Sequence, residues 1–266
     1  MKLLDGAALA EFIKERQAKQ VRVLRQADGV APRLAIIRTN PDPVVDRYMK
    51  LKQDYGSDIF LDVEVHSIKQ SEAPKVIKQL NNDPSVQGII VQIPLPNPEQ
   101  TEEILNLVVG SKDVDGLAHE TSFDPATPVA IDWLLAGYNI ELKGKNILVV
   151  GQGRLVGKPL TKMWQASGYK VGTADRNTTN LAEKTRQADI IVTATGRPEL
   201  ITREMVKSDA VIVDAGVATD KNGLVGDVDP KLRELPLITI TPEKGGVGPL
   251  TVCALFENVI RGARQA

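Results

Sequence analysis

The fold is decided by the stretch Asn146-Ile-Leu-Val-Val-Gly-Gln-Gly-Arg-Leu-Val-Gly-Lys-Pro159, in which an apolar run leads directly into closely spaced glycines. The run predicts a buried strand, and a helix is expected to follow Gly157. Gly151 permits a tight turn, and Gly153 lets the backbone approach a pyrophosphate at the helix N-terminus. The spacing is one residue longer than the common dinucleotide fingerprint. Dinucleotide binding is therefore the favoured interpretation, and a plain strand-to-helix turn is the alternative.

The choice of dinucleotide depends on the residues at the end of the next predicted strand. Asp175 lies 24 positions after Gly151 (175 − 151). An acidic residue at about this offset binds the ribose hydroxyls of NAD. Arg176 follows at once, and an arginine there can bind the 2′-phosphate of NADP, as could Arg154. The two signals oppose each other, and a solvated loop tip is the alternative for both Asp175 and Arg176.

Apolar runs alternate with helical patterns on both sides of this stretch, as expected for parallel strands covered on both faces. The predicted strands are 34–38, 62–67, 86–93, 146–150, 170–174, 190–194, 210–214 and 237–240. The predicted helices are 8–25, 73–80, 133–135, 160–166, 181–187 and 248–264. The polar, turn-rich stretch 112–128 separates two blocks, and we place a domain boundary near residue 118. The sequence allows the last helix to pack on either of the two blocks. The fold class is α/β.

The composition excludes several classes of function. The 266 residues carry a net charge of −1 with 4% aromatic side chains, which argues against a nucleic-acid or anionic-membrane partner. Cys253 is the single cysteine, and His66 and His119 are the two histidines, so neither an intrachain disulfide nor a metal site is expected. No 18-residue apolar run occurs. A cytoplasmic protein is the simplest expectation.

A helix predicted to begin at Asp42-Pro43 and to end at Gly56 carries a lysine on its inward face. Tyr48 and Lys52 share that face, because they are four residues apart. Burial lowers the pKa of a lysine and allows it to act as a base. The alternative is a lysine whose stem covers the rim of the core and whose charge reaches solvent.

Other polar and glycine-rich segments are candidates for the same site. Gln92 interrupts an apolar strand, so it is either a structural hydrogen-bonding group or a site residue. The run Lys112-Asp-Val-Asp-Gly116 carries two carboxylates that could form only a local turn. Glycines also follow later strands, where an open α/β sheet binds its ligand. They lie in the segments Thr195-Gly196, Ala215-Gly216-Val217 and Gly245-Gly-Val-Gly-Pro249.

These segments occur together in one order, and the whole resembles the bifunctional methylenetetrahydrofolate dehydrogenase/cyclohydrolases. The most specific matches are Tyr48-x-x-x-Lys52, Gln92-Ile-Pro-Leu-Pro96, Lys112-Asp-Val-Asp-Gly116 and Thr241-Pro-x-x-Gly-Gly-Val-Gly-Pro-x-Thr251. The resemblance implies a folate domain at 1–118, completed by a C-terminal helix at 250–266, and a Rossmann NAD(P)-binding domain at 119–249. It also implies a homodimer acting in one-carbon metabolism.

The resemblance further implies roles for individual residues. Lys52 would be the catalytic lysine, Gln92 its hydrogen-bonding partner, Tyr48 the ring stacked on the folate, and Asp115 the anchor of the pterin. The implied further contacts to the folate substrate are Gly246 and Pro249. The implied cofactor contacts are Gly151, Gln152, Gly153, Arg154, Gly157, Asp175, Arg176 and Val217.

The sequence departs from the family pattern at the positions expected to distinguish NAD from NADP. Gln152-Gly153 stands where members commonly carry Arg-Ser, and Asp175 replaces a histidine. The local chemistry favours NAD slightly, whereas family habit among bacteria favours NADP. Two further functions remain as alternatives: a dehydrogenase with weak cyclohydrolase activity, and a non-catalytic dinucleotide-binding regulatory protein.

Overall fold

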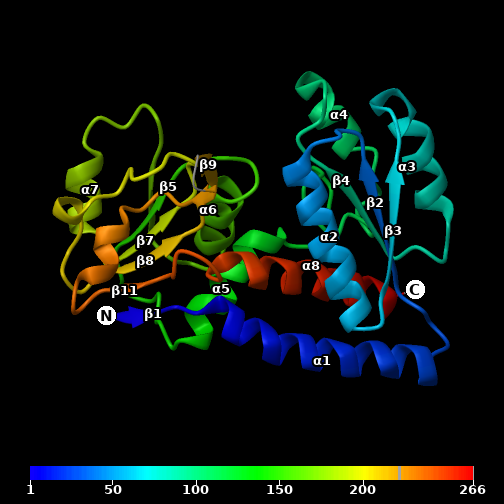
Figure 1. Ribbon diagram of the computed structural model, residues 1–266, viewed down its shortest axis with the longest axis horizontal. Helices are drawn as coiled ribbons and strands as arrows, with labels where there is room; N and C mark the ends of the chain where they lie inside the picture. Colours follow the sequence, from blue (N-terminus) through cyan, green and yellow to red (C-terminus); the bar gives the residue numbers. More distant parts are fainter. Residues whose placement is uncertain (221–222, 266) are drawn as a thin grey trace. The chain divides into compact units, whose positions relative to one another are not determined.

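The computed structural model describes residues 1–220 and 223–265, and the chain divides into two compact units, each built on its own sheet (Figure 1). Unit 1 comprises Met1–Ala10 and Thr127–Thr251, and unit 2 comprises Glu11–Ala126 and Val252–Ala266. The chain crosses between the units near residues 10, 126 and 251, whereas the predicted boundaries lay near residues 118 and 250. Ala266, the last residue of the predicted C-terminal helix, lies outside the described residues. The predicted α/β class in two domains is confirmed.

The sheet of unit 1 has six parallel strands in the order β1-β11-β8-β7-β5-β6. Their bounds are β1 (Lys2–Leu3), β5 (Ile147–Val150), β6 (Val171–Ala174), β7 (Ile190–Thr193), β8 (Val211–Asp214) and β11 (Thr239–Ile240). Without β1, this is the order of a doubly wound nucleotide-binding fold. The chain leaves β5 for β6 on one side and then crosses to β7 on the other. The switch point, where such folds bind ligands, therefore lies at the ends of β5 and β7.

Helices and a small hairpin complete unit 1. They are α5 (Ala126–Gly137), α6 (Gly157–Ala166), α7 (Leu181–Gln187), the start of α8 (Val247–Ala263), the 3-10 turns η3 (Arg203–Met205) and η4 (Pro230–Glu234), and the strands β9 (Ala218–Asp220) and β10 (Gly223–Val225). Helix α6 packs on β5 and β6. All four residues of β5 and of β7 are buried, and all of them except Thr193 are apolar, as expected for strands covered on both faces.

Unit 2 is a three-stranded parallel sheet in the order β3-β2-β4. The strands are β2 (Arg33–Arg38), β3 (Asp62–Ser67) and β4 (Gly88–Gln92), and the helices are α2 (Pro43–Asp58), α3 (Ala73–Asn82) and α4 (Thr101–Leu105), with 3-10 turns η1 (Gln70–Glu72) and η2 (Pro98–Gln100). Ile37 and Val91 are paired neighbours that face a core shared with α3 and α4. Arg38 pairs with Gln92, so these two strands end at the same edge of the sheet.

Two long helices contribute to unit 2 from opposite ends of the chain. Helix α1 (Gly6–Ala27) starts at Asp5, whose Oδ1 accepts the Ala8 N–H at 3.0 Å. Gln17 on α1 is fully buried and donates to the Cys253 carbonyl at 2.9 Å and to Glu257 at 2.9 Å, both on α8. The C-terminal part of α8 thus packs within unit 2.

The structure corrects two predicted elements. Helix α2 continues through Gly56 to Asp58, and the left-handed residue after it is Phe60, with φ of 63°. Gly56 serves close packing instead, because an added Cβ would lie 2.4 Å from Val63 Cγ2. Helix α5 begins at Ala126, although 112–128 was predicted to be turns, because a proline such as Pro128 is tolerated in the first turn of a helix. Strands β1, β9 and β10 were not predicted, and each has only two or three residues.

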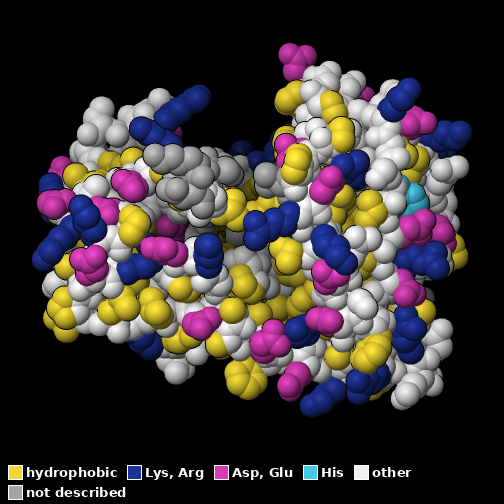
Figure 2. All heavy atoms as spheres, viewed as in Figure 1, with side chains coloured by type: hydrophobic (Ala, Val, Ile, Leu, Met, Phe, Trp, Pro, Cys, Tyr) yellow, Lys and Arg dark blue, Asp and Glu magenta, His cyan; other side chains and the backbone are white. Residues whose placement is uncertain are grey.

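The surface is mixed in charge. On the face shown in Figure 2, basic and acidic side chains are interspersed, in keeping with the net charge of −1. Among the described residues, none of the helices combines the length and hydrophobicity needed to span a membrane. Nor do the described His, Cys, Asp and Glu side chains gather anywhere in a group suited to a metal ion.

Candidate active site

Helix α2 brings the predicted tyrosine and lysine to unit 2. Asp42 caps the helix, since its Oδ1 accepts the Val45 N–H at 3.2 Å, as predicted. Val45 and Met49 anchor the helix in the core. On the same helix, the Tyr48 side chain is 38% exposed, which leaves its ring open to a ligand. Lys52 is half-buried and its Nζ is hydrogen-bonded to Gln92, so of the two interpretations the structure supports the inward-facing lysine.

Gln92 is the direct partner of Lys52. The Lys52 Nζ donates to Gln92 Oε1 at 2.9 Å, across the end of strand β4. The other end of the amide, Gln92 Nε2, donates to the Ile93 carbonyl at 3.1 Å. Because both ends of the amide are hydrogen-bonded, its orientation is fixed, and it holds the lysine at the carboxyl edge of the sheet.

Asp115 lies in a segment that is anchored to strand β4. The Ile89 N–H donates to the Lys112 carbonyl at 2.7 Å. Lys112 itself has a structural role, because its Nζ donates to the carbonyls of Leu80 and Asp83 at the end of α3, at 2.9 and 2.6 Å. Asp113 is also structural, since its Oδ2 accepts the Ala118 N–H at 2.9 Å. Of the two carboxylates in the motif, Asp115 is the one whose charge acts on Lys52.

Lys52 and Asp115 perturb each other's pKa. Burial lowers the pKa of Lys52 from its ordinary value, and the negative charge of Asp115 opposes this shift. Burial raises the pKa of Asp115; the charge of Lys52 opposes that shift and the charge of Asp113 adds to it. Both dominant effects favour the neutral forms. A lysine with a lowered pKa is neutral in a larger fraction of molecules near neutral pH, so it can accept a proton.

Asn258, which the sequence analysis did not identify, holds the Asp115 segment in place. This residue of α8 is 4% exposed, and its Nδ2 donates to the carbonyls of Val114 and Asp124 at 2.9 and 3.0 Å. The sequence does carry a signal for it, because Asn258 interrupts an apolar helix much as Gln92 interrupts an apolar strand. A buried amide must find hydrogen-bond partners, and here they are the backbone on either side of the site loop.

The predicted glycine turn in unit 1 lies at the switch point of the sheet. An added Cβ on Gly151 would lie 2.4 Å from the Ala194 carbonyl oxygen at the end of β7, so only glycine fits. Likewise, a Cβ on Gly157 would lie 1.7 Å from the Gly151 oxygen, so α6 packs directly on the turn. Gly153 is exposed, and a Cβ there would meet nothing within 4 Å. The turn therefore leaves room for a pyrophosphate at the N-terminus of α6.

The side chains around this turn differ in their exposure. Gln152 folds back, with its Nε2 donating to the Gly151 carbonyl at 3.2 Å and to Thr161 Oγ1 at 3.3 Å. Arg154 is exposed on the turn. Asp175 and Arg176 are exposed immediately after β6, and the last residue of that strand, Ala174, accepts the Gly151 N–H at 2.8 Å. These ionic side chains thus lie beside the glycine turn.

Asp175 already takes part in a local turn. Its Oδ1 accepts the Asn177 N–H at 2.9 Å and the Thr178 hydroxyl at 3.2 Å. These bonds fix the direction of the carboxylate at the tip of β6. They are compatible with both interpretations of the sequence, a ribose contact and a loop tip.

The remaining predicted contacts are placed as follows. Gly246 is buried, and a Cβ on Gly6 would lie 1.8 Å from the Gly246 oxygen, so α1 starts against this glycine turn. Pro249 lies in the first turn of α8. Val217 is 57% exposed after β8. His119 is exposed, and its Nε2 lies 2.8 Å from Glu102 Oε1.

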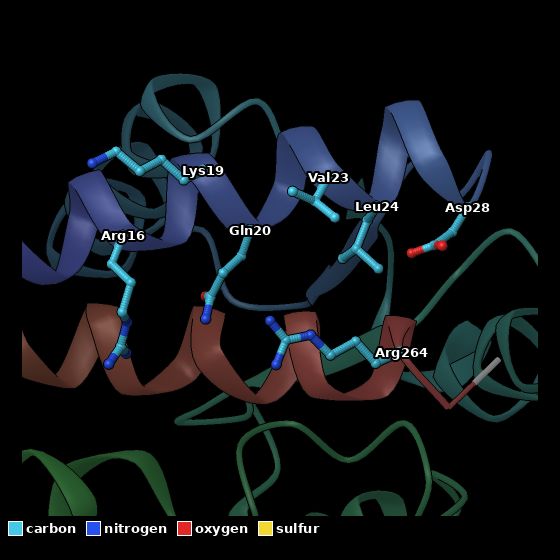
Figure 3. A pocket seen from close by; sticks show the side chains of 7 residues that line it. All are labelled: Arg16, Lys19, Gln20, Val23, Leu24, Asp28 and Arg264. Carbon is cyan, nitrogen blue, oxygen red and sulfur yellow. The ribbon is translucent and has the colours of Figure 1, made fainter.

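A separate pocket lies along α1 and the end of α8 in unit 2 (Figure 3). Figure 3 shows Arg16, Gln20 and Arg264 directed toward this groove. Arg16 is engaged with Glu257 at 2.8 Å, and Val23 and Leu24 supply an apolar wall. The pocket contains none of the predicted site residues, and its charges of both signs give it no single chemistry.

Comparisons with known proteins bear on both units. A family model described as "Tetrahydrofolate dehydrogenase/cyclohydrolase, catalytic domain" matches residues 4–115, and one described as "Tetrahydrofolate dehydrogenase/cyclohydrolase, NAD(P)-binding domain" matches residues 125–266. The chain is 38% identical to the "Bifunctional protein FolD" of Nitratiruptor, over 100% of this chain and 99% of that protein.

Solved structures agree with these matches. The bifunctional enzyme FolD from Campylobacter jejuni, a methylenetetrahydrofolate dehydrogenase/cyclohydrolase, is 35% identical with a TM-score of 0.94, covering 100% of this chain and 99% of that one. The FolD of Trypanosoma brucei, whose structure is a complex with NADP cofactor and inhibitor, is 26% identical with a TM-score of 0.91, covering 99% and 97%.

Proposed function

Because the chain belongs to the tetrahydrofolate dehydrogenase/cyclohydrolase family, we propose that it catalyses two consecutive reactions of one-carbon metabolism. The first oxidises 5,10-methylenetetrahydrofolate to the 5,10-methenyl cation, with transfer of a hydride to NAD(P). The second adds water to that cation, giving 10-formyltetrahydrofolate and a proton. The observation that carries the proposal is the hydrogen bond of 2.9 Å between Lys52 and Gln92, in the unit matched by the catalytic-domain model.

Lys52 is the group suited to the hydrolytic step. Adding water to the methenyl cation requires both protons of the attacking water to leave its oxygen, one reaching the ring nitrogen as the carbon–nitrogen bond breaks and the other passing to solvent. Neutral Lys52 accepts the first of these protons, and the resulting ammonium delivers it to the ring nitrogen. Gln92 orients Nζ through its oxygen, since the other end of its amide is anchored to the backbone. Hydride transfer, by contrast, needs mainly positioning of the reactants.

Tyr48 and Asp115 bind the folate. The half-exposed ring of Tyr48 offers a face on which an aromatic heterocycle can stack. A pterin presents adjacent N–H donors, and a carboxylate such as Asp115 accepts a pair of them with charge-assisted hydrogen bonds. We place Gly246 and Pro249 among the further substrate contacts on the strength of the shared motif.

The glycine turn of unit 1 fits the pyrophosphate of a dinucleotide. A dinucleotide held there would supply the hydride acceptor for oxidation of the folate. The chain would bind and orient this dinucleotide through Gly151, Gly153 and Gly157 at the N-terminus of α6. Arg154 at the turn and Val217 beyond β8 would add further contacts. Asp175 can accept hydrogen bonds from the ribose hydroxyls and repels a 2′-phosphate, whereas Arg176 attracts one. We therefore infer a slight preference for NAD.

The assembly and location are also proposals. The family resemblance supports a homodimer, which sedimentation of the purified protein would test. Cys253 is buried and unbridged, which is compatible with a reducing compartment such as the cytoplasm. The glycine turn proposed for the dinucleotide belongs to unit 1, and the proposed catalytic residues Lys52 and Gln92 belong to unit 2.

Spectrophotometric assays of the purified protein test the function. Methylenetetrahydrofolate is supplied with NAD and, in parallel, with NADP, and methenyltetrahydrofolate hydrolysis is followed separately. Activity in both assays supports the bifunctional enzyme. Oxidation without hydrolysis would indicate the monofunctional dehydrogenase, and neither activity would indicate a regulatory binding protein. The hydrogen bond between Lys52 and Gln92 favours activity in both assays, because a binding module has no need of a base.

A further inference from the structure

Two aspartates with buried side chains lie at the carboxyl ends of the strands of unit 1. Neither was assigned a role from the sequence. Asp214 is the last residue of β8, with a side chain that is 4% exposed. Asp227 follows β10 and is fully buried. Buried carboxylates are costly unless their oxygens are hydrogen-bonded, so their partners indicate what they do.

Asp227 binds the turn that follows β7. Its Oδ2 accepts the Thr195 N–H at 2.6 Å, and its Oδ1 accepts the Arg197 N–H at 2.9 Å. The turn after β8 lies against the same carboxylate, because an added Cβ on Gly216 would be 2.1 Å from Asp227 Cγ. One side chain therefore sets the spacing of two neighbouring turns.

Asp214 extends the same network. Its Oδ1 accepts the Thr193 hydroxyl at 3.0 Å and the N–H groups of Gly216 and Asp227 at 3.1 and 3.0 Å. Its own N–H donates to Thr241 Oγ1 at 3.0 Å, just after β11. The Asp214–Asp227 pair thus joins the carboxyl ends of β7, β8 and β11.

The position of this pair relative to the sheet indicates its function. A dinucleotide lies across the switch point of a doubly wound sheet, with one half over each set of strands. The glycine turn and Asp175 belong to β5 and β6, so the other half, with the nicotinamide, falls over β7 and β8. We propose that Asp227 is a positioning residue for the nicotinamide half of the cofactor, acting through the turns at Thr195–Arg197 and Gly216. This inference rests on the dehydrogenase activity proposed above.

The chemistry of the contact explains why an aspartate is required. Two N–H groups of one turn point at the side chain, and a carboxylate accepts both because each oxygen is an acceptor. Burial raises the pKa of Asp227 while the hydrogen bonds from Thr195 oppose that shift, and the nearby charge of Asp214 raises it again. An asparagine could accept only one of the two bonds and would set its own N–H against the other donor. Turns held in place before binding lose less conformational freedom when the cofactor arrives.

The variant Asp227→Asn tests the proposal, with Asp229→Asn as a matched control. Asp229 lies two residues further on, and its Oδ1 accepts the Lys231 N–H at 2.9 Å to cap η4. In Asp227→Asn we expect the KM and Kd for the dinucleotide to rise at least tenfold. Hydrolysis of methenyltetrahydrofolate, measured without dinucleotide, should stay within twofold, and the control should match the unaltered protein in both assays.

Unchanged dinucleotide affinity in folded Asp227→Asn, or an equal loss of both activities, would overturn the inference. If the unaltered protein binds no dinucleotide at all, it is the proposed function that fails. Hydrogen exchange on the unaltered protein gives a second test that does not depend on the variant folding. The amides of Thr195 and Arg197 should be protected before any dinucleotide is added. Rapid exchange of both amides, followed by protection only on binding, would show that the turns are not positioned in advance.

Discussion

Asp115 partly offsets the effect of burial on the pKa of Lys52. Burial lowers the pKa of Lys52 and the charge of Asp115 partly restores it. The variant Asp115→Asn removes that charge, so the pKa of Lys52 should fall further. In the proposed mechanism hydrolysis depends on neutral Lys52, so its rate should rise as pH passes upward through this pKa. We therefore expect the rising limb of the pH–rate profile to move to lower pH.

A limb that moves to higher pH would contradict the assignment. The control is Asp124→Asn, because Asp124 is an exposed aspartate of the same loop. This variant should leave the rising limb at its original pH.

The same aspartate should also anchor the substrate. Replacing it by alanine in Asp115→Ala removes the acceptor for the pterin, which should weaken folate binding by more than about 1 kcal/mol. Dinucleotide binding should not change, because the glycine turn belongs to the other unit. Calorimetric titration with a folate analogue and with NAD measures both quantities on one preparation. Equal affinity for the analogue in the variant and in the unaltered protein would remove Asp115 from the site.

At the scale of elements, helix α8 holds the loop that carries Asp115. In Asn258→Asp the two N–H donors that bind the carbonyls of Val114 and Asp124 are lost, and a buried carboxylate faces two carbonyl oxygens. We expect the free energy of unfolding to fall by about 1–3 kcal/mol and the KM for folate to rise. Denaturant titration and steady-state kinetics measure the two effects.

The control for this variant is Asn82→Asp. Asn82 is exposed at the end of α3, where its Nδ2 donates to the Lys78 carbonyl at 2.8 Å. It should lower stability less and leave the KM for folate unchanged. If Asn258→Asp loses stability without any change in that KM, α8 supports the fold alone and not the site.

The elements also show what the sequence could predict. Strands β2, β5 and β7 were recognisable because a short, uninterrupted apolar run between polar segments is typical of a strand covered on both faces. The helix carrying Lys52 was recognisable from its cap at Asp42, but its end was not, because Gly56 serves packing against Val63 rather than the turn. Strand β1 has two residues and depends on pairing with β11, so no local pattern reveals it.

The candidate site was predictable to a similar extent. Lys52, Gln92 and Asp115 are conspicuous because they are polar residues in motifs of one family. Asp214 and Asp227 are not, because most of their hydrogen-bond partners lie in turns and strand ends that are distant in sequence. Lys112 illustrates the opposite case, since this charged residue of the same motif binds the end of α3. Only the folded chain distinguishes such structural contacts from functional ones.

At the scale of the whole molecule, the residues that follow β6 in unit 1 are expected to set the preference between NAD and NADP. Asp175→Ser removes the charge that repels a 2′-phosphate and leaves Arg176 free to attract one. We expect the ratio of kcat/KM for NADP over that for NAD to rise. Steady-state dehydrogenase assays with both cofactors measure it. A strong NADP preference in the unaltered protein that disappears in Arg176→Ala would show that Arg176 dominates and that the preference inferred here is wrong.

The central claim is that one chain performs two reactions and that Lys52 acts as a base in only one of them. The most direct test is the variant Lys52→Gln, assayed on one preparation for methenyltetrahydrofolate hydrolysis and for methylenetetrahydrofolate oxidation. Proton transfer by a positioned group contributes roughly 10²–10⁴-fold, so hydrolysis should fall by about that factor. Oxidation should fall by no more than about tenfold, because it needs position rather than a base. An equal loss of both activities in a correctly folded variant would contradict the account.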